Sequence, residues 1–236
     1  MQFKLNVLFI KLGLSLLMVF LSFLVMAQPT GLLYDPEPPV DSAYVRVILA
    51  SPAGGGVDVL VDGRVRVEKL ASGKPSDYLV LAAGKHAVAL HVPGKPAAHL
   101  STTFDVLRGK AITLAFATLS ADSVPVAFED KANANKLKAL LTVYNLDAKA
   151  GDIDVLTADT NTKVLTGIAY GKSASIPVNP ISIDLIAVKI GDKVPPSRIS
   201  IAMIQGGTYS IFLLPGKDAK SNAQTVENKI ERFTGK

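Results

Sequence analysis

The chain repeats itself at an offset of 96 residues, the distance from Val57 to Ile153. The clearest match joins residues 57–60 (Val-Asp-Val-Leu) to residues 153–156 (Ile-Asp-Val-Leu). Self-similarity sustained over most of a domain length predicts two tandem copies of one small domain. Further matches, the last of them shifted by one residue, join 44–47 to 140–143, 87–90 to 183–186 and 109–114 to 206–211.

Both copies have the pattern of antiparallel β-structure. Short runs of alternating apolar and polar residues are separated by turns such as Asp62-Gly63, and this pattern is typical of a β-sandwich. We therefore predict an all-β fold with two tandem β-sandwich domains, immunoglobulin-like or similar to a carbohydrate-binding module, at 42–121 and 137–216. The predicted strands are 42–49, 57–61, 65–70, 77–81, 85–92, 101–107 and 111–118 in the first copy, and 138–146, 152–157, 163–169, 174–178, 182–188, 197–204 and 208–214 in the second.

The N-terminus has the pattern of a secretory signal. Lys4 and Lys11 precede an apolar run over 12–26, and the small residue Ala27 ends it. The run is shorter than the about 20 residues that a membrane-spanning helix needs. We predict a signal peptide over 1–27 with cleavage after Ala27, and an uncleaved N-terminal anchor is the alternative. The chain contains no cysteine, so disulfides and a lipid-modified cysteine are excluded.

Three segments lie outside the predicted sandwiches. Residues 28–41 are rich in proline and form an extended leader. Residues 122–136 break the strand pattern and are predicted to be the interdomain linker. Residues 217–236 form a tail in which Val226, Ile230 and Phe233 lie at helical spacing. We predict a short amphipathic helix there and propose these three side chains as a partner contact, because an apolar helix stripe can insert into a groove.

The charge is mildly basic. Without the two signal lysines, the net charge is (25 − 2) − 20 = +3. No basic block reaches what nucleic-acid binding requires, so that class of partner is excluded. A mild surplus of positive charge is compatible with an acidic polysaccharide or an acidic protein surface.

The sequence gives no pattern of a catalytic, metal or cofactor site. His86 and His91 are separated by an odd number of residues on one predicted strand, so they should point to opposite faces. They and His99 are interpreted as surface or strand-edge residues. The absence of cysteine removes the usual zinc arrangements, and no Gly-x-Ser-x-Gly motif of a serine hydrolase is present. We predict no catalytic residue, no metal ligand and no cofactor.

Five residues are candidates for a recognition surface. Asp58 and Asp154 occupy equivalent positions in the two copies, where each is either simply solvated or part of a shared surface. Arg46 lies among apolar neighbours in a strand and is either solvent-facing or an anchor for a carboxylate of a partner or sugar. Tyr78 and Tyr209 are aromatic residues that could stack on a sugar or sit half-buried at a sandwich corner.

Several motifs together resemble one family. Their order along the chain, from residue 33 to residue 212, is similar to that of the AlgF-type alginate O-acetylation proteins. The motifs are Leu33-Tyr34-Asp35-Pro36, 39–47 (Pro-Val-Asp-Ser-Ala-Tyr-Val-Arg-Val), 78–84 (Tyr-Leu-Val-Leu-Ala-Ala-Gly), 138–146 (Lys-Ala-Leu-Leu-Thr-Val-Tyr-Asn-Leu), Val178-Asn179-Pro180 and 206–212 (Gly-Gly-Thr-Tyr-Ser-Ile-Phe).

The resemblance implies a periplasmic, non-catalytic accessory protein. Its partners would be periplasmic acetyltransferases and a membrane-bound O-acyltransferase of an exopolysaccharide system, which place acetyl groups on the polymer. The leading hypothesis is therefore an adaptor that docks an acetyltransferase or acyl-relay partner during O-acetylation, most naturally of alginate. The alternative is a periplasmic glycan-binding module that holds the acidic polysaccharide itself.

Overall fold

The computed structural model describes residues 41–51, 55–94, 100–120, 123–190, 198–216 and 221–230. All of them belong to one compact unit, Pro38–Lys236. The predicted signal peptide and all but the last residue of the predicted leader lie outside the described residues. In the part of the chain that is described, no helix has the length and apolar character needed to cross a bilayer.

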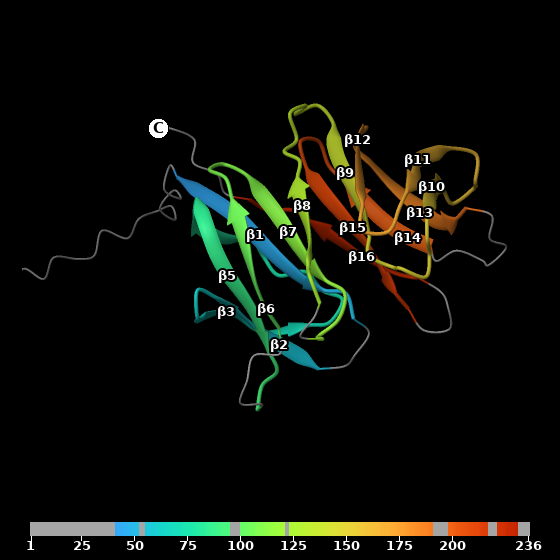
Figure 1. Cartoon of the computed structure of the whole chain (residues 1–236). Helices are drawn as coiled ribbons and strands as arrows, with labels where there is room; N and C mark the ends of the chain where they lie inside the picture. Colours follow the sequence, from blue (N-terminus) through green and yellow to red (C-terminus); the bar gives the residue numbers. More distant parts are fainter. Residues whose placement is uncertain are drawn as a thin grey trace, which may run out of the picture. The chain divides into compact units, whose positions relative to one another are not determined.

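The first half of the unit forms eight strands in two sheets (Figure 1). One sheet has the order β4-β1-β7-β8 and the other the order β3-β2-β5-β6. The strands are β1 (Ser42–Leu49), β2 (Gly56–Val61), β3 (Arg64–Ala71), β4 (Leu79–Ala82), β5 (Gly84–His91), β6 (Leu100–Val106), β7 (Ala111–Phe116) and β8 (Val126–Asp130).

The second half repeats this topology strand for strand. Its sheets have the orders β12-β9-β15-β16 and β11-β10-β13-β14, and each strand number is eight higher than its counterpart. In both halves the central pair is parallel, β1 with β7 and β9 with β15, while the other pairs are antiparallel. The strands are β9 (Ala139–Asn145), β10 (Ile153–Thr157), β11 (Lys163–Ile168), β12 (Ser173–Val178), β13 (Ile181–Lys189), β14 (Arg198–Met203), β15 (Thr208–Pro215) and β16 (Ser221–Glu227).

Each half encloses its own apolar core, as the alternating sequence pattern requires. In β2 the valines at 57, 59 and 61 point inward and are buried, while Asp58 and Leu60 alternate with them and stay partly exposed. The first core contains residues of β1 to β7, and the second contains residues of their counterparts β9 to β15. The prediction of an all-β fold with two sandwich-like units is confirmed.

The strands β1, β9 and β15 are buried on both faces. In β1, Val45 and Val47 belong to the first core, whereas Ile48 on the opposite face belongs to a third apolar cluster that contains side chains from both halves. The sheets β4-β1-β7-β8 and β12-β9-β15-β16, which we call the inner sheets, therefore contact each other through the faces that point away from the two sandwich cores. The other two sheets are the outer sheets. This third cluster consists of Ile48, Ala50, Ala115 and Phe128 from the first half and Tyr144, Leu146, Phe212 and Leu214 from the second, with Val126 and Val226 at its edge.

Two segments differ from the sequence-based expectation. The predicted linker at 122–136 contains a strand, β8, whose backbone pairs with β7. Its alternate residues Phe128 and Asp130 are buried, and Phe128 belongs to the third apolar cluster. The predicted tail helix is wrong, because residues 221–227 form β16. The edge of β15 offers backbone partners along the whole segment, Pro215 to Tyr209 opposite Ser221 to Glu227, and a short isolated helix is marginal in water.

Candidate functional site

The most densely connected polar site centres on Arg46, in the middle of β1. Its side chain is 1% exposed. Nε donates a hydrogen bond to Thr113 Oγ1 (2.8 Å) on the neighbouring strand β7, and Nη1 donates to Asn228 Oδ1 (2.7 Å) in the second half. Nη2 donates to Ser210 Oγ (2.9 Å) and to Tyr144 Oη (3.3 Å). The guanidinium group is therefore satisfied by side chains from both sandwiches.

Asp130, at the end of β8, supplies the matching negative charge. Its Oδ2 lies 3.7 Å from Arg46 Nε and accepts hydrogen bonds from Thr113 Oγ1 (2.7 Å) and Tyr78 Oη (2.7 Å). Its Oδ1 accepts a hydrogen bond from Tyr144 Oη (2.6 Å). A buried ion pair persists when hydrogen bonds satisfy its remaining donors and acceptors, and here both carboxylate oxygens have such partners. We call Arg46, Thr113, Asp130, Tyr144, Ser210, Asn228 and Tyr78 the Arg46 network.

Aromatic rings enclose the guanidinium group. Its carbon lies 4.7 Å from the ring centroid of Tyr78, 5.0 Å from that of Phe212 and 5.7 Å from that of Tyr144. Tyr144 stacks on Phe212 at 4.7 Å. Burial raises the pKa of the Tyr78 and Tyr144 hydroxyls far above their usual value, so both remain donors to Asp130. The site is thus a closed structural joint between two sheets and offers no free acid or base.

This geometry corrects the prediction for Arg46. The residue is not solvent-facing and cannot belong to an exposed recognition surface. It does anchor a carboxylate, but that carboxylate is Asp130 of the same chain. Tyr78 is half-buried against it, which is the corner position that the sequence left open. Tyr209 is buried in the second core, where its hydroxyl accepts a hydrogen bond from the Ile204 backbone N–H (3.0 Å), so it too lies on no open surface.

Asp58 and Asp154 have the same structural role in the two halves. Asp58 lies opposite a β-bulge in β3, and its Oδ1 accepts a hydrogen bond from the backbone N–H of Lys69 (2.8 Å). Asp154 lies opposite a bulge in β11, and its Oδ1 accepts from Gly167 (2.9 Å). Both bulge residues have positive φ, +50° for Lys69 and +63° for Gly167. Each aspartate therefore holds an irregular edge strand in place, a role that goes beyond simple solvation.

A second charged residue contributes at Asp154. Lys163 Nζ lies 2.9 Å from Asp154 Oδ2. This hydrogen bond, followed by the one from Gly167, lowers the pKa of the Asp154 carboxyl group.

His86 contacts an aspartate and a backbone carbonyl. Nδ1 lies 2.7 Å from Asp62 Oδ2, and Nε2 lies 2.8 Å from the backbone carbonyl of Ala82. Both ring nitrogens therefore face acceptors, so the doubly protonated ring satisfies them best. The hydrogen bond to Asp62 raises the pKa of His86 and lowers that of Asp62. A general base needs a ring nitrogen free to take a proton from a nucleophile, and neither nitrogen here is free.

The predicted partner contact is not assembled as a helix stripe. Val226 lies in β16 and packs at the edge of the third apolar cluster. Ile230 follows β16 and is half-buried, and Phe233 lies outside the described residues. Among the described residues, no three histidine, aspartate or glutamate side chains come together as a metal site.

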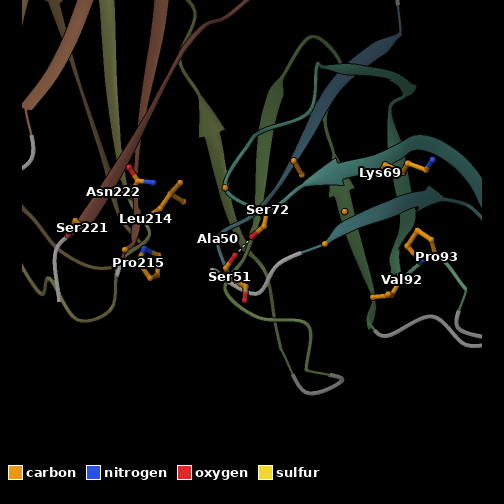
Figure 2. A pocket seen from close by; sticks show the side chains of 15 residues that line it. Ala50, Ser51, Lys69, Ser72, Val92, Pro93, Leu214, Pro215, Ser221 and Asn222 are labelled. Atoms are coloured by element: carbon orange, nitrogen blue, oxygen red, sulfur yellow. Dashed lines mark hydrogen bonds between the residues drawn. The ribbon is translucent and has the colours of Figure 1, made fainter. Parts of the chain in front are cut away.

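An open groove of about 1070 Å³ lies where β1 and β15 end (Figure 2). Ala50, Ser51 and Ser72 line it from the first half, and Pro215 and Asn222 line it from the second. Ser72 Oγ donates to the Ser51 carbonyl within it. Its lining combines small and polar residues with the apolar side chains of Val92, Pro93, Leu214 and Pro215, has Lys69 as the cation and includes no aromatic ring. The groove can offer hydrogen bonds and one positive charge, but no stacking platform for a sugar.

The sequence reasoning missed most members of the Arg46 network. Thr113, Ser210 and Tyr144 each interrupt an apolar strand with a polar group, and that was the available signal. Their convergence depends on the contact between the two halves, which a strand pattern does not specify. Asp130 lay in the segment interpreted as linker.

Comparison with known proteins gives three findings. Residues 43–156 match the model of a domain of unknown function, DUF4397. The chain is 24% identical over 202 residues to "Alginate biosynthesis protein AlgF" of Azotobacter vinelandii, which covers 86% of each chain. Among solved structures, the C-terminal domain of AlgF from P. aeruginosa matches 39% of this chain and 100% of its own, with 22% identity and a TM-score of 0.34.

A second solved structure is a carbohydrate-binding module of family CBM26 from Eubacterium rectale Amy13K, in complex with maltoheptaose. It covers 80% of this chain and 98% of its own, with 13% identity and a TM-score of 0.30. The sequence match spans both sandwiches and confirms the resemblance seen in the motifs. The chain is a distant, nearly full-length homologue of AlgF.

Proposed function

We propose that this chain is a non-catalytic accessory protein for O-acetylation of an exopolysaccharide, with alginate as the polymer. It acts in the periplasm after removal of residues 1–27, and it docks periplasmic acetyltransferases or the membrane-bound O-acyltransferase of the same system. The observation that carries this proposal is the similarity to an alginate biosynthesis protein over 86% of both chains.

The use of the ionisable groups supports a non-catalytic role. Arg46 and Asp130 satisfy each other inside the joint between the sandwiches. Asp58 and Asp154 hold bulges, and both nitrogens of His86 already face acceptors. The carboxylates and the imidazole among these groups are of the types that acid–base chemistry uses, and each is engaged in stabilising the fold.

The joint between the sandwiches supports a docking role. Because the Arg46 network and the third apolar cluster connect the two inner sheets, the two outer sheets are held as a pair. A fixed pair of surfaces can bind a partner without losing interdomain freedom on association, which is a cost that a flexible tandem would face.

The acetyl content of the secreted polysaccharide tests the proposal. It is compared among the parent strain, a strain with this gene deleted and a strain in which the gene is restored. We expect deletion to remove acetyl groups while polymer yield stays intact, and restoration to recover them. Unchanged acetylation after deletion overturns the proposal.

Binding to partners is tested separately. The chain from Gln28 onward is immobilised, and the periplasmic acetyltransferases of the same system are passed over it. Saturable binding supports docking. Loss of acetylation in the deletion strain without measurable binding to any partner retains the pathway role but overturns the adaptor mechanism.

The groove favours one second candidate, a glycan-binding module. Lys69 could pair with a uronate carboxylate, and Ser51, Ser72 and Asn222 could bond to hydroxyl groups. Calorimetric titration of mannuronate oligomers tests it, with Lys69→Ala as the matched variant. Heat that saturates in the wild-type chain and disappears in the variant supports this candidate, and absence of heat at millimolar oligomer removes it.

A further inference from the structure

Three connections meet at one end of the second sandwich. Lys138 Nζ donates a hydrogen bond to Asn179 Oδ1, and the backbone carbonyl of Lys138 accepts one from Gly206 N–H (3.0 Å). Ile181 pairs with Met203, where the strands β13 and β14 begin and end. Residues 131–138, 178–182 and 203–207 therefore form one continuous surface, which we call the tip.

The tip presents aliphatic side chains to solvent. Leu137 is 72% exposed, Ile204 is 64% exposed and Ile181 is 49% exposed. The backbone beneath them is fixed, because the Asn133 side-chain amide donates to the carbonyls of Lys138 (2.8 Å) and Gly207 (3.1 Å). Three exposed aliphatic residues gathered on an ordered surface indicate an interaction site.

The charge of the tip is entirely positive. Lys131, Lys136 and Lys138 lie in its first segment, and its three segments contain no aspartate or glutamate. Lys131 and Lys136 are exposed. The three segments thus combine aliphatic groups with three lysines, and Glu227 lines a pocket with Ile204 at their edge. The complement of this surface is an apolar phase bordered by negative charge.

The direction of the strands adds a second observation. Arg46 of β1 contacts Ser210 of β15, and both strands then run to the groove, which Ala50 and Leu214 line together. The starts of β1 and β15 consequently lie at the same end of the unit. Ser42, through which the N-terminal segment joins the sandwiches, therefore lies at the end that carries the tip. Under the proposed export, the N-terminal segment is the part of the chain that meets the bilayer, and it joins the sandwiches at the end that carries the tip.

We propose that the tip is a membrane-docking surface that inserts Leu137, Ile181 and Ile204 into the interface of an anionic lipid bilayer. The lysines lie beside the aliphatic side chains, where their stems remain in the interfacial region and their ammonium groups reach the headgroups. An aliphatic cluster on the ends of three connections suits a deformable bilayer, which needs no complementary groove, better than it suits an acidic protein. The proposal does not require the O-acetylation role, but its second observation rests on the proposed export.

Co-sedimentation with vesicles tests it. The chain from Gln28 onward is mixed with vesicles of phosphatidylcholine alone or of phosphatidylcholine with phosphatidylglycerol. We expect binding to the anionic vesicles only. Leu137→Ser/Ile204→Ser should weaken it about tenfold through lost apolar contact. Lys131→Glu/Lys136→Glu should weaken it by at least fivefold per lysine, following the attraction of about 1 kcal/mol that each lysine has near an anionic surface.

Two control variants lie at the opposite end of the unit. Val124, 81% exposed, precedes β8. Lys172 is exposed in the turn between β11 and β12, where its carbonyl accepts a hydrogen bond from Asn145 N–H at the end of β9. Val124→Ser and Lys172→Glu should bind as the wild type does. Circular dichroism of each variant checks that it is folded, and the lysine pair decides the matter if the serine pair fails to fold.

Three outcomes overturn the proposal. They are no binding of the wild type to anionic vesicles, equal binding of the tip variants and the wild type, or equal weakening by the control variants. If the tip variants instead lose binding to an acetyltransferase while vesicle binding is absent, the surface is a protein contact and the membrane assignment is wrong.

Discussion

The two halves of the molecule have the same topology, but at the place where they meet their equivalent polar residues differ in charge. Arg46 pairs with Thr113 in the first half, and at the equivalent places of the second half Thr142 pairs with Ser210. Asp130 of β8 lies opposite Ala111, the first residue of β7. Asn228 has the equivalent place in the second half, because its N–H donates to the carbonyl of Thr208, the first residue of β15. The first copy therefore contributes one cation and one anion, and the second contributes neutral partners at the equivalent places.

This difference shows how two copies of one domain can form a single joint. A second arginine and a second aspartate at the equivalent positions would bury two more charges at a high desolvation cost. Ser210 and Asn228 instead accept hydrogen bonds from Arg46, whereas Thr142 bonds to Ser175 within its own sheet. Where the copies do not meet, at the bulges held by Asp58 and Asp154, the same residue is retained in both.

The largest effect is expected from breaking the ion pair of the Arg46 network. Arg46→Met leaves Asp130 buried without its cation and should lower the free energy of unfolding by about 3–5 kcal/mol. Asp130→Asn should cost a similar amount for the converse reason. The double variant removes both charges and should cost less than the sum of the two. Urea denaturation measures all three, and an additive double variant would contradict the pairing.

Removal of the aspartate that holds the bulge should lower the free energy of unfolding by about the same amount in both halves. Asp58→Ala and Asp154→Ala each remove an acceptor from a backbone N–H, and each should lower the free energy of unfolding by about 1 kcal/mol. The same urea titrations provide the measurement. A cost at one position and none at the other would mean that the two bulges are not equivalent.

Substitutions of the bulge residues Lys69 and Gly167, unlike those of the aspartates, should have different effects on stability in the two halves. Gly167 has φ +63° and open space around it, so Gly167→Ala should destabilise through backbone strain by about 1 kcal/mol. Lys69 already adopts φ +50° with a side chain, so Lys69→Gly should relieve strain and cost little or nothing. Thermal melting of the two variants should therefore shift in different directions or by clearly different amounts.

The His86–Asp62 pair gives the first half a pH effect on the alkaline side as well as on the acid side. The pKa of His86 is raised in the folded state, so its contribution to stability is full below its unfolded pKa of about 6.5 and is lost as pH rises through the folded value. The pKa of Asp62 is lowered, so its contribution is lost as pH falls below about 3.8.

Asp62→Asn checks this window. The difference in unfolding midpoint between wild type and variant should be greatest between about pH 4 and pH 6 and should shrink at alkaline pH. Ser182 occupies the place of His86 in the second half at the repeat offset, so no comparable dependence is expected there. A difference that grows with alkaline pH would refute the assignment.

The sequence supports prediction of the strands and of the repeat because both depend on local alternation. Asp58 and Asp154 could be matched from their equivalent neighbours, but their bulges could not, since a bulge adds a residue to the partner strand without changing the apolar pattern. The same alternation puts Tyr44, Arg46 and Ile48 on one side of β1. That this side faces the second copy rather than water depends on contacts across about 100 residues of chain, which period-2 patterning does not encode.

The tail shows the converse failure. Val226, Ile230 and Phe233 fit a helical period, yet Val226 pairs opposite Ser210 because β15 would otherwise leave backbone donors and acceptors open along its edge. Spacing over three residues is weak evidence when a sheet edge is available nearby.

Calorimetry of the chain from Gln28 onward tests most directly whether the two sandwiches behave as one body. Domains that unfold as a unit give one transition whose calorimetric enthalpy equals the van't Hoff enthalpy. The joint formed by the Arg46 network and the third apolar cluster predicts this result for the wild type and two separate transitions for Arg46→Met. Two transitions in the wild type, at positions that Arg46→Met does not change, would contradict it.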